Sequence, residues 1–197
     1  MLPSDLIARF TLDRINKKSA IFDTEKLEWM NGQHLALMTG SELVPLVAPM
    51  LVASGLIGEE EVLDRHDWLA DLMELLKIRS RTLDGIPEQA RVFLAPLDGY
   101  EAAGVEKHWK EPREVAARLG AVGGALAALP QWTPASIEES LRTTAAAQGI
   151  GFGKLVHPLR LALTGSSASP GIDQVICLLG RDEIQRRIVA AIEWLEA

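Results

Sequence analysis

The stretch KLVHPLRLALTGSSASPG, from Lys154 to Gly171, combines features that rarely occur together. It contains two prolines, two glycines, a single arginine and a run of hydroxyl side chains, and it directly precedes a helical pattern. This many helix-breaking residues argue against a core element, whereas its leucines argue against a plain surface loop. The rest of the chain has to show which role the stretch has.

Outside this stretch, apolar residues recur at intervals of three and four, and alternation with period two is almost absent. After GEEE (58–61), apolar residues from Val62 to Leu76 predict a helix with Lys77, Arg79 and Arg81 in its last turn. Further helices are expected over residues 42–53, 87–93, 112–129, 134–148 and 181–195. The predicted fold class is therefore all-α, with some extended structure expected near the N-terminus.

Helix ends also carry specific signals. Thr133-Pro134 and Ser169-Pro170 each place a hydroxyl at an expected N-cap and a proline at the first helical position. Gly149 and Gly180 are expected to end helices.

Two seams divide the chain into candidate parts. MNGQHLALMTGS (30–41) separates a mixed N-terminal segment from a first helical bundle, and LAPLDGYEAAG (94–104) connects that bundle to a second. We predict a short segment at 1–34, a first helical subdomain at 35–97 and a second at 98–197.

The charge is unevenly distributed. The formal net charge is −7, which by itself argues against nucleic acid. Residues 35–76, however, hold eight acidic side chains and one basic side chain, Arg65. A polyanion is therefore still expected to approach the remaining surface, above all around Lys77, Arg79, Arg81 and Arg91.

Several chemistries are not expected. The four histidines lack metal-ligand spacing, no glycine-rich phosphate loop follows a strand, and GSSAS (165–169) has no strand setting or base. We predict no catalytic residue and no metal site. This indicates a binding module or a part of a larger protein. The single cysteine, Cys177, fits a reducing cytoplasm, and no uncharged apolar run reaches 18 residues.

Three stretches, in the right order, resemble bacterial glutamyl-tRNA synthetases. FTLDRINKKSAIFDTEKLEWMNGQHL (10–35) is similar to the segment that follows their catalytic core, and RSRTLDGIPEQARVFL (79–94) to a block of their first anticodon-binding bundle. GKLVHPLRLALTGSSASPGIDQVICLLGRD (153–182) resembles their C-terminal block. The resemblance covers nearly the whole chain, but the two nucleotide-binding signatures of the family's catalytic domain are missing; INKKSAIF resembles one of them only by coincidence.

The resemblance implies a tRNA-binding, anticodon-recognising C-terminal half without the aminoacylating domain. Its implied partners are that domain and tRNA(Glu), with tRNA(Gln) left open. It implies no cofactor for this chain, while ATP and Mg²⁺ would serve the missing domain. It also implies a cytoplasmic protein without membrane association, expected to be a monomer. The alternative is an all-helical protein-interaction module on the same scaffold that has lost RNA binding.

The resemblance also implies site residues. Arg160, Ser169, Pro170 and Ile172 fall at positions that contact the anticodon in the family. Arg79 matches an arginine that reads the third anticodon base in members restricted to glutamate tRNA, although Arg81 stands two positions away. Arg14, Lys17, Lys18 and Lys26 are expected to contact the tRNA backbone through phosphates, which positions the RNA without specifying its sequence.

Overall fold

The computed structural model describes residues 3–14 and 21–197, and within these ranges every regular element is a helix. The all-α class is thus confirmed. The extended structure expected near the N-terminus is wrong for the residues described there, because α1 (Pro3–Arg9) and the 3₁₀ helix η1 (Leu12–Arg14) occupy it. The other helices are α2 (Thr24–Leu37), α3 (Gly40–Ala53), α4 (Glu59–Asp64), α5 (His66–Lys77), α6 (Ile86–Leu94), α7 (Ala102–His108), α8 (Pro112–Ala127), α9 (Pro134–Ala147), α10 (Phe152–Thr164), α11 (Ile172–Leu179) and α12 (Arg181–Glu196).

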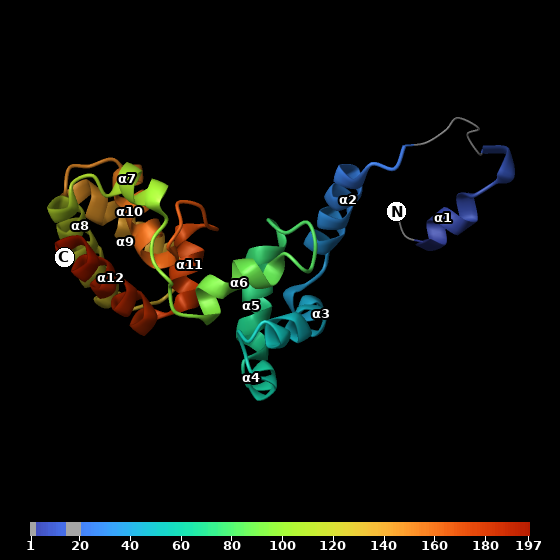
Figure 1. Ribbon diagram of the computed structural model, residues 1–197, viewed down its shortest axis with the longest axis horizontal. Helices are drawn as coiled ribbons and strands as arrows, with labels where there is room; N and C mark the ends of the chain where they lie inside the picture. Colours follow the sequence, from blue (N-terminus) through green and yellow to red (C-terminus); the bar gives the residue numbers. More distant parts are fainter. Residues whose placement is uncertain (1–2, 15–20) are drawn as a thin grey trace.

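The first core forms where α3 packs against α5 and α6 (Figure 1). Thr39 caps α3 through a capping box, in which its hydroxyl accepts the Glu42 N–H and the Glu42 carboxylate accepts the Thr39 N–H at 2.7 Å. The seam predicted at 30–41 is largely helical, because α2 continues to Leu37 and α3 begins only three residues later. The predicted subdomain boundaries at 34/35 and 97/98 stay predictions.

The single helix predicted from residue 59 to residue 81 is wrong. The chain breaks it at Arg65, whose φ of −111° and ψ of 20° separate α4 from α5. The physical reason is packing: α4 has no buried residue, whereas α5 lays an apolar face against α3. Lys77 lies in the last turn of α5 as predicted, but Arg79 and Arg81 lie beyond the end of that helix.

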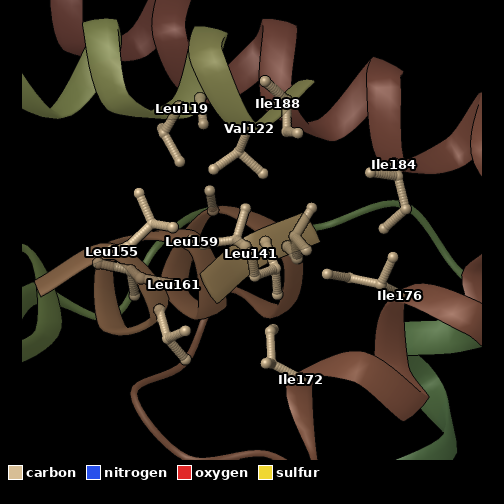
Figure 2. Packing of buried hydrophobic residues seen from close by; sticks show 14 of the residues in the cluster. Leu119, Val122, Leu141, Leu155, Leu159, Leu161, Ile172, Ile176, Ile184 and Ile188 are labelled. Atoms are coloured by element: carbon tan, nitrogen blue, oxygen red, sulfur yellow. The ribbon is translucent and has the colours of Figure 1, made fainter. Parts of the chain in front are cut away.

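The second core is built by α8 to α12, with α10 at its centre (Figure 2). The argument that the stretch from Lys154 to Gly171 is too punctuated for a core element is wrong for its first part, because α10 up to Thr164 buries most of its side chains. These buried residues are Leu155, Val156, Pro158, Leu159, Leu161, Ala162, Leu163 and Thr164. Pro158 lies only six residues after the start of α10, and the residues around it supply enough apolar surface to keep the helix in the core.

The predicted helix ends are confirmed in three places and corrected in one. Thr133 caps α9, Gly149 follows α9 with φ +66°, and Gly180 ends α11 with φ +81°. Ser169-Pro170, by contrast, does not start a helix: α11 begins at Ile172 with Gly171 as its N-cap. The Ser169 hydroxyl is instead engaged by Arg160, which keeps residues 169–170 in the loop.

The two cores meet at α11. Val175 is buried in the first core although its helix belongs to the second, and the Trp68 indole N–H donates to the Leu178 carbonyl at 3.0 Å. In Figure 1, α11 lies on the side of the second core that faces α5 and α6. In the described part of the chain, no helix combines the length and apolar character needed to cross a membrane.

Candidate functional site

A cavity of about 580 Å³ lies between the two cores, and we call it the interbundle cavity. It is bounded by the end of α5, by α6, by the segment 95–101 and by the loop 165–171. Its lining comprises Leu76, Arg79, Glu88, Gln89, Arg91, Val92, Phe93, Pro96, Leu97, Asp98, Gly99, Tyr100, Glu101, Thr164, Gly165, Ser166, Ala168, Ser169 and Pro170. The cavity therefore brings together predicted site residues that lie 90 positions apart in the sequence.

Arg79 is placed at the cavity by the turn that follows α5. Its backbone N–H donates to the Leu76 carbonyl at 3.0 Å, which fixes this turn after the helix ends. Its side chain lines the cavity and makes no ion pair with a carboxylate of the described residues. Arg81 is exposed and is not among the cavity residues; its carbonyl accepts the Asn31 side-chain N–H at 2.6 Å. The structure thus separates the two arginines between which the sequence left a choice.

Arg160 holds the loop that carries Ser169 and Pro170. Its guanidinium donates to the Ser169 carbonyl at 3.0 Å, to the Pro170 carbonyl at 2.6 Å and to the Ser169 hydroxyl. Burial lowers the pKa of Arg160 and the nearby Arg79 lowers it further, while Asp173 partly offsets both. One nitrogen of the Arg160 guanidinium is therefore engaged in positioning the loop, and the direct contact with the anticodon stays a prediction.

Glu101 holds the other end of the same loop. Its backbone N–H donates to the Gly165 carbonyl at 2.8 Å, and its carboxylate accepts the Ser167 N–H at 2.8 Å. The hydrogen bonds from Ser167 lower the pKa of Glu101, with a smaller opposing effect of desolvation. Sequence reasoning missed this residue, because its role depends on a loop 66 positions away.

We expect the contact between the Glu101 carboxylate and the Ser167 N–H to be lost at acidic pH. Because the folded state lowers the pKa of Glu101 below its ordinary value of 4.5, its contribution is present above pH 4.5 and is lost as the pH falls through the folded pKa. Hydrogen exchange at residues 166–168 should therefore accelerate relative to α8 as the pH drops below about 4.5. In Glu101→Gln, which keeps an acceptor oxygen but cannot titrate, the loop should exchange faster at neutral pH and lose this acid dependence. Wild-type-like exchange in the variant at every pH would show that Glu101 does not brace the loop.

The other predicted residues are distributed differently. Ile172 is 5% exposed and packs into the second core, so its side chain does not line the cavity. Lys26 is exposed on α2, and Arg14 ends η1. Lys17 and Lys18 lie outside the described residues. The roles predicted for all of these residues stay predictions.

The cavity offers mixed chemistry rather than one sign of charge. Arg79 and Arg91 face it together with Glu88, Asp98 and Glu101, and Arg91 pairs with Glu88 at 3.5 Å. Phe93, Leu97 and Pro170 supply apolar walls. Donors, acceptors and flat apolar surface in one cavity suit the edge and face of an unstacked base better than a phosphate. Within the described ranges, no group of three or more metal-ligating side chains is present.

Comparison with known proteins gives the family context. The model of a family described as the anticodon binding domain matches residues 42–192. The glutamate–tRNA ligase of Moorella thermoacetica is 33% identical over 190 residues, which are 96% of this chain and 39% of that protein. The enzyme of the same name from Stenotrophomonas maltophilia is 37% identical over 194 residues, 95% of this chain and 39% of that protein.

A solved structure is similar along nearly the whole chain. A glutamate tRNA ligase from Elizabethkingia meningosepticum, in complex with its amino acid, superposes with a TM-score of 0.85 at 27% identity. The match covers 98% of this chain and 36% of that one. This chain thus spans about 39% of the length of the relatives it matches in sequence.

Proposed function

Because this chain belongs to the anticodon binding domain family, we propose that it is the anticodon-reading part of a glutamate–tRNA ligase. Relatives that bear this name match it over nearly its whole length at 33% and 37% identity. The alternative, a protein-interaction module that has lost RNA binding, has no support among the comparisons.

The observation that carries the proposal is the convergence of Arg79, Ser169 and Pro170 on the interbundle cavity. Two separately built cores hold them there, and Arg160 and Glu101 brace the loop from both ends. A rigid cavity of this kind suits bases splayed out of a single-stranded loop, which are read by hydrogen bonds to their exposed edges.

Under this proposal, anticodon recognition and the joining of glutamate to tRNA are carried out by different domains of the ligase. Joining glutamate to tRNA would take place on a catalytic domain that this chain does not contain, and ATP and Mg²⁺ would be used there. Support comes from the relatives, of which this chain covers about 39%, and from the missing nucleotide signatures. We further propose tRNA(Glu) as the RNA partner, with the protein working in the cytoplasm as a monomer.

Arg79 provides the test of specificity. Glutamate anticodons end in C, whose Watson–Crick edge offers the acceptors O2 and N3 to a guanidinium, whereas G presents N1–H and N2–H donors. Changing that base from C to G should therefore weaken binding of an anticodon stem-loop by about fivefold to 150-fold, or roughly 1–3 kcal/mol. Arg79→Gln should shrink this ratio, because an amide can donate or accept.

Arg81→Gln is the matched control, since it removes the same charge two positions away and outside the cavity. Both RNAs are titrated against wild type and the two variants at one salt concentration. Arg81→Gln should leave the C-to-G ratio unchanged. An equal loss of affinity for both RNAs in Arg79→Gln would make Arg79 a phosphate contact, and an unchanged ratio would remove it from base recognition.

A further inference from the structure

A second cavity, of about 320 Å³, lies in the second bundle between α7, the start of α8 and the first turns of α10. We call it the paired-histidine cavity, and its ionisable lining is dominated by Lys107, His108, Lys110, Lys154 and His157. Anticodon reading at the interbundle cavity makes no use of these side chains.

Two imidazoles stack inside this cavity. The rings of His108 and His157 have centroids 5.0 Å apart and planes inclined by 12°. Burial lowers the pKa of half-buried His108, and His157 and Lys107 lower it further against a weaker opposing effect of Glu101. Without an anion nearby, protonation of one ring disfavours a charge on the other. Negative charge that enters the cavity would therefore favour the protonated form of His108.

Three lysines that line this cavity have no carboxylate partner in the part of the chain that the structure describes. Lys107, Lys110 and Lys154 are exposed, and none of them has a carboxylate oxygen of the described residues within 4.0 Å. Some cations on other helices, such as Lys77 and Arg142, do pair with a glutamate on their own helix, at 2.5 and 2.6 Å.

Acidic lining residues are few. Glu111 is the carboxylate that lines the cavity, and Arg118 is held by Glu114, which is not part of the lining, at 2.5 Å. Although the net charge of the chain is −7, unpaired positive charges of the described residues therefore gather at the paired-histidine cavity.

We propose that the paired-histidine cavity binds a phosphate group, which a backbone phosphate of the bound RNA supplies. Ammonium groups and imidazole N–H donors around a small hollow are complementary to phosphate oxygens, whereas the same lysines would repel a metal cation. The site reads no base, so it would position the RNA rather than select it. The RNA source rests on the function proposed above.

The two cavities are connected by a single rigid element. Gly153 and His157 at the start of α10 line the paired-histidine cavity, and Thr164 at its end lines the interbundle cavity. At 1.5 Å per residue, the helix separates Thr164 from His157 by about 11 Å and from Gly153 by about 17 Å. One RNA strand can span that distance in a few nucleotides, so an RNA held at its anticodon can place a neighbouring phosphate over the lysines.

The test uses the 197-residue chain and a double variant, Lys107→Gln with Lys154→Gln. Both lysines are exposed, so the fold should be kept. The matched control is Arg113→Gln with Arg186→Gln, which removes two exposed positive charges outside the cavity. We expect the cavity variant to bind the anticodon stem-loop about tenfold more weakly, with a shallower salt dependence, by about 0.7 in the log–log slope per lost phosphate contact. The control should change affinity less than about twofold.

Two probes identify the ligand by NMR of the imidazole protons. Inorganic phosphate and the stem-loop should each shift the His108 and His157 resonances in wild type and raise the pKa of His108. Shifts with phosphate but not with RNA would overturn RNA as the source, and shifts with neither would overturn the site. If the stem-loop binds no form of the protein while phosphate still shifts the histidine resonances, the proposed anticodon-reading function is wrong.

If the stem-loop binds the cavity variant and the control equally well, anticodon reading stands and only the proposed phosphate site for RNA is wrong.

Discussion

Gly165→Ala is expected to destabilise the second bundle and to distort the interbundle cavity. Gly165 ends α10 with φ +70°, and a Cβ added there would lie 2.7 Å from the Gly99 carbonyl oxygen. The left-handed backbone costs an alanine about 1–2 kcal/mol, and the overlap with a backbone atom adds about 1–3 kcal/mol. The free energy of unfolding, measured with urea, should therefore fall by about 2–5 kcal/mol.

The control for this substitution is Gly149→Ala. Gly149 has nearly the same φ, +66°, but a Cβ there would meet no atom within 4 Å. It should show the left-handed cost alone, about 1–2 kcal/mol, and leave RNA affinity unchanged. Gly165→Ala should also weaken the anticodon stem-loop about tenfold, because the displaced carbonyl belongs to the cavity wall. Equal destabilisation by the two substitutions would mean that the segment around Gly99 can shift away from the added methyl group with no loss of stability.

Arg160→Met should weaken RNA binding about tenfold or more, through the loop rather than through a lost base contact. Methionine keeps the apolar stem but leaves the Ser169 and Pro170 carbonyls without their donor. Losing these charge-assisted bonds should also reduce the free energy of unfolding by about 1–3 kcal/mol. Hydrogen exchange at residues 166–171 should accelerate, a readout that a side chain used only for base contact would not change.

Arg142→Met is the matched control for Arg160→Met. It removes a guanidinium from the same bundle, but Arg142 is exposed and donates to Glu138 on its own helix at 2.6 Å. Stability and affinity should both stay close to wild type, since exposed pairs contribute little. If Arg160→Met lost affinity while loop exchange stayed unchanged, Arg160 would be a direct base contact and the positioning role would be wrong.

Much of the local structure could be predicted from short-range patterns. The intervals of three and four specify helices, and the Thr133-Pro134 start and the ends near Gly149 and Gly180 need only residues within one turn. The Ser169-Pro170 prediction failed although it used the same reasoning. Arg160, nine residues earlier and beyond the reach of one helical turn, takes up the hydroxyl that would otherwise cap a helix.

The sequence by itself determined the helical class, because that class depends on the spacing of apolar residues along the chain. The residues predicted to contact RNA came from the resemblance of three stretches to a known family. Only the tertiary structure decided which of the predicted residues lie close together. It buried α10 despite Pro158, turned Ile172 into the core, placed Arg79 rather than Arg81 at the cavity and recruited Glu101 to the loop. The physical reason is that the burial of a side chain, and its hydrogen bonds to another segment, depend on elements far away in the sequence. The local spacing of apolar residues carries no information about those elements.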